Sequence, residues 1–526
     1  MHDMAEDKVQ SVHPAKPAPP TSTPLSILDN TCAHFFRFAA AKLYRAASPD
    51  PFGSDDLLRQ SLSLVLSAYP HFAGRLRLAR PDDGGEEYRR RYGRAWVDYG
   101  QGEDQDPGVE LVFSSSSKTL DSLLPSSNEV GVGISDATNL QRTGIYPPEN
   151  AVVLLRPVPN EGVNLAIKVT RFSCGGTALG FRMSHALGDA SVLSRFATDW
   201  ADVHRQLFRG IAREDVPLPV RPFGPALVDS HALGDLNSAA ADPAIEEEYI
   251  ASLPRSTYDA WTPHPSAPPE SGPIPPVELD ALDDASGRPR GAPLPWHTWD
   301  YSAPVSLRTV SLSAADLSRI HHRALAFSNG ERVSVHDALV AHFWRLSLRA
   351  RADKVSPEKT IVLTPAVGVR ARLDPPLDPS TVGSIFVLLA SRVPFSTLIS
   401  EEGTAAAALA IRSAIASATP RALGALLHHH AHELDPMRVH PSFCGDENVS
   451  MSSWIGAGSY DADFGAGRPV LAEGTLPDVD NMLLFEEEPV TEENERLKWH
   501  ERGARVRLAV REEVMERVLA DPELRG

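Results

Sequence analysis

The amino-acid sequence predicts an α/β protein of two domains. Its 526 residues exceed what a single hydrophobic core usually organises. Strand-like and helix-like periodicities follow one another in both halves of the chain. Between the halves, residues 213–300 are rich in Pro, Gly and acidic residues and lack long periodic segments. We therefore expect a partly mobile linker or surface crossover there.

The first half begins with a helix pattern and contains a hairpin. Residues 54–68 place apolar side chains at helical spacing behind Ser54, a typical N-cap residue. Residues 163–185 alternate in hydrophobicity on both sides of the turn sequence Gly175-Gly176, which predicts a β-hairpin. After Asp189 the apolar period becomes helical.

The second half repeats the succession of strands and helices. Residues 334–351 form an amphipathic helix pattern behind a Ser N-cap, and residues 359–373 are typical of a buried strand. Residues 405–418 predict an Ala-rich helix, and residues 504–524 predict a strand followed by a helix.

Charge and cysteine content limit the partners and the compartment. The net charge of −18 argues against broad binding to nucleic acid or to an anionic membrane, because both need a basic face. No apolar run approaches the roughly 20 residues of a membrane-spanning helix. The three cysteines are odd in number and far apart, which favours a reducing compartment, the cytoplasm. Residues 1–25 lack the apolar stretch of a secretory signal and are expected to form a Pro-rich tail.

The hexapeptide Ser-His-Ala-Leu-Gly-Asp occurs twice, at residues 184–189 and 230–235. His185 stands where a strand ends and a helix begins, so it can project from the sheet edge, and Asp189 can brace the loop from the helix start. His231 lies between prolines and a segment without apolar periodicity. We therefore interpret His185 as the candidate functional residue and His231 as a linker residue.

A second motif lies near the C-terminus, where residues 463–467 read Asp-Phe-Gly-Ala-Gly. The pair of HxxxD in mid-chain and DFGxG near the end resembles the BAHD acyltransferases, especially their fungal branch of the trichothecene 3-O-acetyltransferase type. Further segments are similar to that family in the same order, over most of the chain: "PTSTPLSILDN", "LLRQSLSLVLSAYPHFAGRL", "RFSCGGTALGFRMSHALGDA", "VSVHDALVAHFWRLSLRAR", "VGVRARLDPPLDPSTVGS" and "VREEVMERVLADPEL".

The sequence departs from the family pattern at several positions. Ala190 replaces the usual glycine after the aspartate, and Ala466 replaces the tryptophan common in plant members. Gly383-Ser384 stands where Gly-Asn is usual, and Gly368-Val369 replaces Asp-Gly. These departures weaken any transfer of substrate identity from the family to this chain.

The resemblance implies an α/β fold of two chloramphenicol-acetyltransferase-like domains, each a mixed β-sheet flanked by helices, with a channel at their interface. We place the first domain at residues 26–212, the crossover linker at 213–300 and the second domain at 301–526. A segment from about Asp463 onward is expected to return to the first domain.

The resemblance also implies the chemistry. His185 would be the general base that removes a proton from an alcohol or amine as it attacks a thioester. Ser452 and the indole N–H of Trp454 would be donors to the oxyanion, with ordinary strand packing as the alternative. Acyl-CoA would be a cosubstrate and not a permanently bound cofactor. The acceptor would be a small molecule of secondary metabolism, and we expect a monomer with no nucleic-acid or membrane partner.

Two carboxylates are expected to support this site. Asp463 belongs to the second motif and is grouped with the catalytic residues, but we expect both Asp189 and Asp463 to act structurally. The resemblance implies that each pairs with an arginine. Arg370 and Arg372 are the best candidates, because residues two apart on a strand share a face and could serve one buried network.

Other clusters and reaction types stay open. His428 and His432 lie one helical turn apart, which could bind zinc, but the HExxH pattern and a third ligand are missing from the sequence. The acidic residues 484–495 predict a solvated surface loop. The fold could also be reused for a non-acyl reaction such as a base-promoted cyclisation, or could take its acyl group from a carrier protein.

Overall fold

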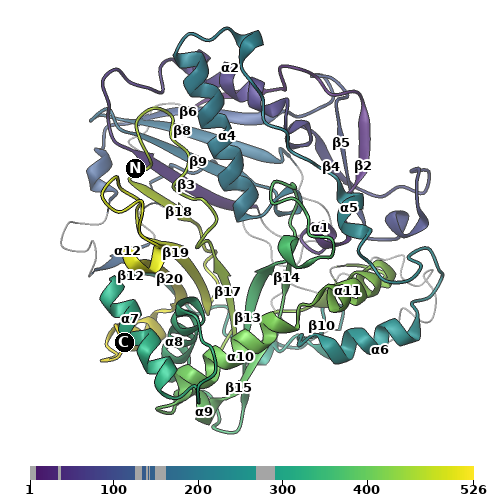
Figure 1. Ribbon diagram of the computed structural model, residues 1–526, viewed down its shortest axis with the longest axis vertical. Helices are drawn as coiled ribbons and strands as arrows, with labels where there is room; N and C mark the ends of the chain where they lie inside the picture. The colour runs from purple at the N-terminus through teal and green to yellow at the C-terminus, as the bar shows by residue number, and fades with distance from the viewer. Residues whose placement is uncertain are drawn as a thin grey trace.

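The computed structural model describes residues 7–33, 37–124, 133–137, 140, 143–148, 162–262, 264–267, 291–436 and 438–526. Two mixed β-sheets with helices packed on them account for most of this part of the chain (Figure 1), in agreement with the predicted α/β class. None of the helices in these ranges has the length and hydrophobicity needed to span a bilayer.

The first sheet contains the predicted hairpin. Its order is β1-β6-β8-β9-β3-β18, and β8 and β9 pair antiparallel from Leu165–Met183 to Arg171–Thr177. Helices α2 and α4 lie over this sheet (Figure 1), and their apolar side chains belong to the same core cluster as those of its strands. The bounds are β1 Lys8–Val12, β6 Val109–Ser116, β8 Leu165–Phe172, β9 Thr177–Met183, β3 Phe38–Tyr44, β18 Leu471–Gly474, α2 Asp55–Leu66 and α4 Ala190–Phe208.

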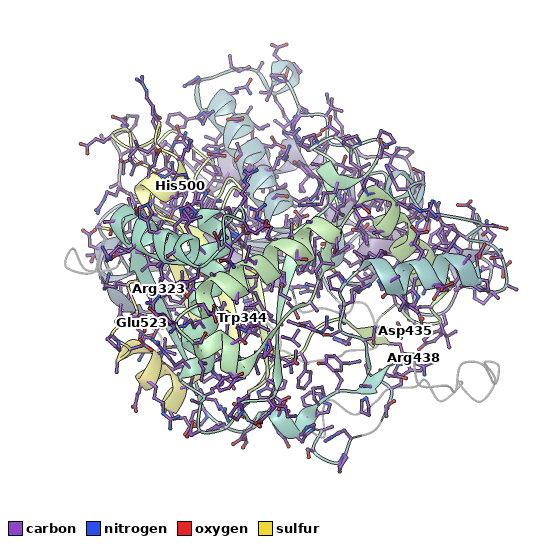
Figure 2. The ribbon with its side chains drawn as sticks, turned by 60° about the horizontal axis from the view of Figure 1, so that its bottom comes forward. Arg323, Trp344, Asp435, Arg438, His500 and Glu523 are labelled. Carbon is purple, nitrogen blue, oxygen red and sulfur yellow. The ribbon has the colours of Figure 1, made fainter. Side chains whose placement is uncertain are left out.

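The second sheet has the order β14-β13-β17-β19-β20-β12-β7, and β15 pairs with β13. Trp344 of α8 is fully buried in the core under this sheet (Figure 2). The bounds are β14 Phe386–Leu388, β13 Thr360–Gly368, β17 Asn448–Ser453, β19 Met482–Glu487, β20 Ala504–Arg511, β12 Val305–Leu312, β7 Ile134–Asp136, β15 Ser391–Pro394, α7 Ala314–Ala326, α8 Val335–Arg349, α9 Phe395–Ile399, α10 Gly403–Ser417 and α13 Glu512–Leu519.

Two small sheets complete the fold, in the orders β2-β5-β4 and β11-β10-β16. The bounds are β2 Thr21–Pro24, β5 Ala95–Tyr99, β4 Arg75–Leu78, β11 Ala292–Pro293, β10 Tyr258–Asp259, β16 Val439–His440, α1 Ile27–Asn30, α5 Pro225–Asp229, α6 Pro243–Ser252, α11 Pro420–His432 and α12 Trp499–Arg502.

The two large sheets exchange strands. β18, which follows Asp463 in the chain, pairs antiparallel with β3 of the first sheet. In return β7, from the first half of the chain, pairs with β12 of the second sheet. Each sheet is therefore completed by a strand from the other half (Figure 1). The domain boundaries given above stay a prediction.

The structure differs from the sequence-based expectations in several places. Within residues 1–25, β1 pairs with β6 and β2 with β5, because short edge strands need only backbone hydrogen bonds and carry little side-chain pattern. The linker 213–300 contains α5, α6, β10 and β11, while its residues 268–290 lie outside the described ranges. The strand expected over residues 359–373 ends at Gly368, and Arg370–Arg372 form a 3-10 turn closed by a hydrogen bond from the Arg372 N–H to the Val369 carbonyl.

Candidate active site

His185 lies at the junction that the sequence predicts. β9 ends at Met183, His185–Leu187 form a single 3-10 turn, and α4 begins directly after Asp189. The Asp189 carboxylate accepts the N–H groups of Ser191 and Val192, both at 3.1 Å, which makes it the N-cap of α4. The turn is therefore fixed at both ends, by the sheet and by the helix cap.

The hydroxyl of Ser384 sets the orientation of the His185 ring. Ser384 Oγ donates its hydrogen to the backbone carbonyl of His185 and lies 3.0 Å from His185 Nδ1. Because the single hydroxyl hydrogen is already used, Oγ must accept a hydrogen from Nδ1. A neutral imidazole carries one N–H, so Nε2 then holds the lone pair. This is the tautomer that a base needs.

The surroundings of His185 keep its ring neutral. Burial lowers the pKa of His185 below its usual value, against the opposing effects of a hydrogen bond to its own backbone and of the Asp189 charge. Phe38 and Phe386 pack on the ring with centroids 4.8 and 5.4 Å away. The ring therefore faces an apolar environment in its unprotonated form at neutral pH.

Asp29 anchors Ser384 from the other end of the chain. Its Oδ1 accepts the backbone N–H of Ser384 at 2.7 Å, and its Oδ2 accepts the hydroxyl of Ser26 at 2.6 Å. Asp29 is 2% exposed, and burial raises its pKa to about 6. A buried carboxylate 355 residues away in sequence thus fixes the backbone that carries the His185 partner.

Asp189 and Arg370 form a second brace of the same loop. Arg370 donates to the Asp189 carboxylate at 2.6 Å and to the backbone carbonyl of Gly383 at 2.7 Å. The expected shared network of Arg370 and Arg372 is wrong, because the 3-10 turn removes the strand on which both would face one way. In the described part of the chain, Asp189 pairs with Arg370, and Arg372 pairs with neither carboxylate.

A cavity of about 490 Å³ opens in front of His185. Its lining comes from both halves of the chain and includes Ser452 and Trp454, the predicted oxyanion donors. Trp454 follows the end of β17 and is 8% exposed, and its ring lies 6.1 Å from that of Phe38, which also contacts His185. Ser452, Trp454 and His185 therefore border one cavity.

Asp463 lies away from this cavity. Its Oδ1 accepts the N–H groups of Gly465 and Gly467 at 2.7 and 2.9 Å, and its carboxylate is 3.7 Å from Arg205 of α4. The neighbouring Phe464 is fully buried in the core of the first half. Asp463 therefore holds its own loop on α4 and does not contact the residues around His185.

The second hexapeptide is more ordered than its sequence suggests. His231 follows α5, and its ring nitrogens lie 2.8 Å from the carbonyl oxygens of Leu227 and Pro375. His231 is a residue of the predicted linker, as expected, but the contact with Pro375 attaches this part of the linker to the second half of the chain. His231 does not line the His185 cavity, so it is a tether between segments.

The histidine pair on α11 is also structural. His428 Nδ1 lies 2.7 Å from the Leu233 carbonyl, and its Nε2 accepts the Asp242 N–H at 3.0 Å. His432 Nδ1 lies 2.8 Å from the His428 carbonyl. The described residues contain no group of three or more side chains placed to hold a metal ion.

The sequence reasoning missed Asp29 and Ser384. A signal for Asp29 was present, since Ser26 and Asp29 have the spacing of a capping box and form one at α1. Ser384 stood out only as a departure from the usual Gly-Asn pair. Nothing local in either segment indicates that they meet beside His185.

Known proteins resemble this chain in sequence over much of its length. The chain matches the sequence model of the Transferase family over residues 5–85, 134–212 and 294–515. The acyltransferase AFT15-1 of Alternaria alternata is 27% identical over 61% of this chain, which spans about 59% of that protein's length. The acyltransferase abl6 of Leptosphaeria maculans is 24% identical over 98% of this chain and 96% of its own.

The fold agrees with solved structures of the same class. The structure of F. graminearum TRI101 complexed with coenzyme A and deoxynivalenol superposes with a TM-score of 0.59 at 16% identity, covering 96% of this chain and 98% of that one. At this identity the likeness establishes the fold, and the family match over most of the chain establishes the relationship. The chain belongs to the Transferase family, the BAHD acyltransferases.

Proposed function

We propose that this protein transfers an acyl group from acyl-CoA to the hydroxyl or amine of a small molecule, with His185 as general base. The observation that carries the proposal is the contact between His185 Nδ1 and Ser384 Oγ, which leaves the lone pair on Nε2. The lowered pKa of His185 supports it, because a base must be unprotonated at the working pH.

The proposed step needs no covalent intermediate on the enzyme. The acceptor oxygen or nitrogen loses its proton to Nε2 of His185 and forms a bond to the thioester carbonyl carbon. The carbon–sulfur bond then breaks, and the thiolate takes the proton from the imidazolium to give free coenzyme A and the acylated product. Each proton and electron pair is therefore accounted for by the two substrates and one imidazole.

The oxyanion that forms on the carbonyl needs hydrogen-bond donors. Ser452 and Trp454 border the same cavity as His185, and a hydroxyl and an indole N–H can both donate. Asp189 supports His185 indirectly, because it caps α4 and binds Arg370. Asp463 stabilises the loop that follows it and the contact of this loop with α4. We assign these two carboxylates a supporting role and no contact with substrate.

The proposal also covers the cofactor requirement, the metabolic role and the location of the protein. Acyl-CoA is a cosubstrate, and no cofactor is held permanently. The similar proteins AFT15-1 and abl6 are fungal acyltransferases, which supports a role in secondary metabolism. We expect the protein to act as a cytoplasmic monomer that binds neither nucleic acid nor membranes.

The test is to incubate the purified protein with a panel of acyl-CoA thioesters and small-molecule alcohols and amines, and to measure free thiol. We expect thiol release that depends on the acceptor and on His185. Turnover with an acyl carrier protein but with no acyl-CoA would contradict the assigned donor. Acceptor conversion without any thiol release would contradict acyl transfer altogether.

A further inference from the structure

One wall of the His185 cavity is a cluster of aromatic rings. Trp296 and Trp299 stack nearly parallel, with centroids 5.4 Å apart and an angle of 11° between the rings. Phe443 meets both edge-on, at 5.1 and 5.6 Å. All three line the cavity and are less than 10% exposed. With Leu294 and Val479 they form a separate apolar cluster, which we call the aromatic wall.

Leu294, Trp296 and Trp299 of the aromatic wall come from the segment that the sequence predicts to be a linker. β11 precedes the two tryptophans and pairs with β10, and β10 pairs with β16 of the second half. Arg438 beside β16 bonds the buried Asp259 of β10 at 2.9 Å and stacks over Trp261 at 4.6 Å. Figure 2 shows Arg438 next to Asp435 at the end of α11. The wall is thus fastened to the second half.

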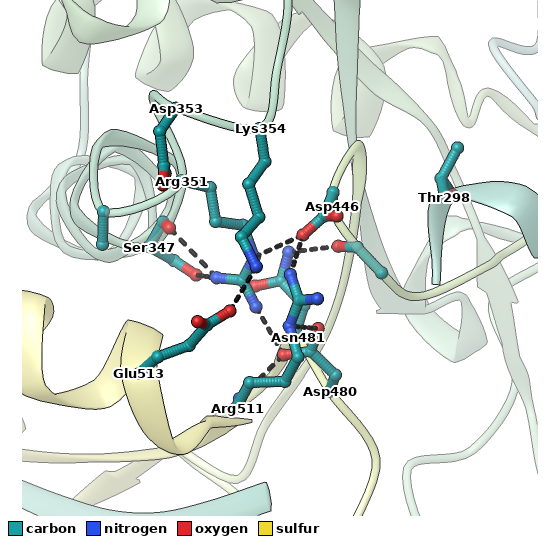
Figure 3. Close-up of polar contacts among 12 residues, drawn as sticks. Thr298, Ser347, Arg351, Asp353, Lys354, Asp446, Asp480, Asn481, Arg511 and Glu513 are labelled. Carbon is teal, nitrogen blue, oxygen red and sulfur yellow. Dashed lines mark hydrogen bonds and ion pairs between the residues drawn. The ribbon is translucent and has the colours of Figure 1, made fainter. Parts of the chain in front are cut away.

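A buried ion network fixes the turn between the two tryptophans. The backbone N–H of Asp446 donates to the Thr298 carbonyl at 2.9 Å. The Asp446 carboxylate is held by Arg351 and Arg511, and both arginines also pair with Asp480 (Figure 3). Arg351 is 0% exposed. The rings therefore sit on a rigid support, and a ligand would meet a preformed surface.

Over its described residues the cavity offers no unpaired Asp, Glu, Lys or Arg side chain to a ligand. Among its described lining only Asp189 and Arg370 belong to these residue types, and they pair with each other at 2.6 Å. The other polar groups are mostly hydroxyls of serines and threonines. An ionised group inside would lose its hydration and gain no counter-charge, which costs several kcal/mol by order of magnitude. The part of the substrate that enters must be neutral.

From this geometry we propose that the aromatic wall selects a substrate with a flat, uncharged ring system, which packs on Trp296, Trp299 and Phe443 while its other end reaches His185. The inference rests on the proposed function for the identity of the reaction. It assigns the wall, with its two tryptophans from the crossover segment, as the specificity determinant. The volume of about 490 Å³ suits such an occupant, since sites for drug-sized ligands span roughly 300–1,000 Å³.

The first test measures binding and does not need turnover. The dissociation constant of 2-naphthol is measured by calorimetry against decahydro-2-naphthol, which has the same carbon skeleton but is not flat, and against 2-naphthoate, which is flat but charged. We expect the flat neutral alcohol to bind at least about threefold tighter than the saturated one and at least about tenfold tighter than the anion. Equal binding of all three probes would overturn the inference.

The second test uses variants. In Trp296→Leu the dissociation constant of 2-naphthol should rise roughly fivefold or more, and in Trp296→Phe, which keeps a ring, by less. Trp499→Leu is the matched control, because Trp499 is a tryptophan of α12 outside the cavity. An unchanged dissociation constant in Trp296→Leu would contradict the inference, and the comparison of probes on the native chain stands even where a variant does not fold.

Kinetics identify which substrate carries the ring. If the acceptor carries it, Trp296→Leu raises KM for 2-naphthol with acetyl-CoA; if the acyl group carries it, the variant raises KM for 2-naphthoyl-CoA with a ring-free alcohol. Either result supports the wall, and no change in either KM would refute it. Ring binding without thiol release would leave the wall standing and refute the proposed function, so the two failures are distinguishable.

Discussion

Replacing Ser384 by alanine removes the hydroxyl that lies 3.0 Å from Nδ1 of His185 and that bonds the His185 carbonyl. The Ser384 backbone N–H would keep its bond to Asp29, so the loop stays in place. A net hydrogen bond contributes about 0.5–1.5 kcal/mol, and about 1.4 kcal/mol corresponds to a tenfold change in rate. We therefore expect kcat to fall roughly twofold to twelvefold. That loss is small beside the ~100- to ~10,000-fold contribution of the base itself.

The assay is a comparison of kcat, KM and the pH profile of thiol release. Ser384 does not line the cavity, so KM should not change. In the native protein the Ser384 hydroxyl oxygen accepts a hydrogen bond from Nδ1, and this bond stabilises the imidazolium more than the neutral ring. Without it, the pKa of His185 should fall further. The acidic limb of activity, already below the usual histidine range, should then move to lower pH. Ser380→Ala, in the exposed loop before it, is the matched control. A rise in KM at constant kcat, or an unmoved pH profile, would refute the assigned tautomer.

The remaining predictions concern the other groups of the site. His185→Ala should lose at least about a hundredfold in turnover while it stays folded, whereas His231→Ala should stay close to wild type in turnover and lose about 0.5–1.5 kcal/mol of stability with its tether; equal turnover of both variants would sink the mechanism. Asp189→Asn and Asp463→Asn should lower the melting temperature along with activity, so a fully stable but inactive Asp463→Asn variant would point instead to direct catalysis. KM for acyl-CoA should rise with salt, because the phosphates of the donor are anionic and exposed charges are screened, and a salt-independent KM would count against a nucleotide donor. The buried Asp29 has its pKa raised from 3.8 to about 6, so the native state binds its proton more tightly than the unfolded chain. Stability should therefore fall as pH rises from about 4 to about 6, and melting temperatures of Asp29→Asn across that window should lack this decline.

The position of His185 could be predicted because its signals are local. The hairpin alternation up to Met183 and the helical period after Asp189 each occupy consecutive residues, and the structure has β9 and α4 at those positions. The N-cap role of Asp189 follows from the same boundary. The periodicity of the sequence therefore predicts both the strand before His185 and the helix after it.

The partners of His185 could not be predicted in the same way. Ser384 reaches the ring from 199 residues away, and Asp29 reaches Ser384 from 355 residues away. Such contacts depend on how two sheets pack, which no short window of sequence contains. The error at Arg372 has a related cause, because the turn at Arg370–Arg372 is set by contacts of Arg370 to the Gly383 carbonyl and to Asp189.

The strands of the crossover segment could not be predicted for a different reason. β10 and β11 are two residues long each, so they carry no period that a sequence pattern could reveal. What orders them is pairing with β16 and the buried contact of Asp259 with Arg438. A Pro-rich composition predicts the absence of long elements but not the absence of fixed contacts. For this reason the tryptophans at positions 296 and 299 were not recognised as part of the site.

The exchanged strand β18 connects both sheets next to the cavity. β18 is bonded to β3 in the first sheet, and its Glu473, 5% exposed, pairs with Arg505 and Arg507 of β20 in the second. Removing Glu473 would leave these two arginine charges buried without their partner, and breaking a buried ion pair in this way costs about 3–5 kcal/mol. Gly474, at the end of the same strand, packs so closely on Trp454 that a Cβ there would lie 3.0 Å from the indole. The strand that joins the two sheets therefore also packs against a candidate oxyanion donor at the edge of the His185 cavity.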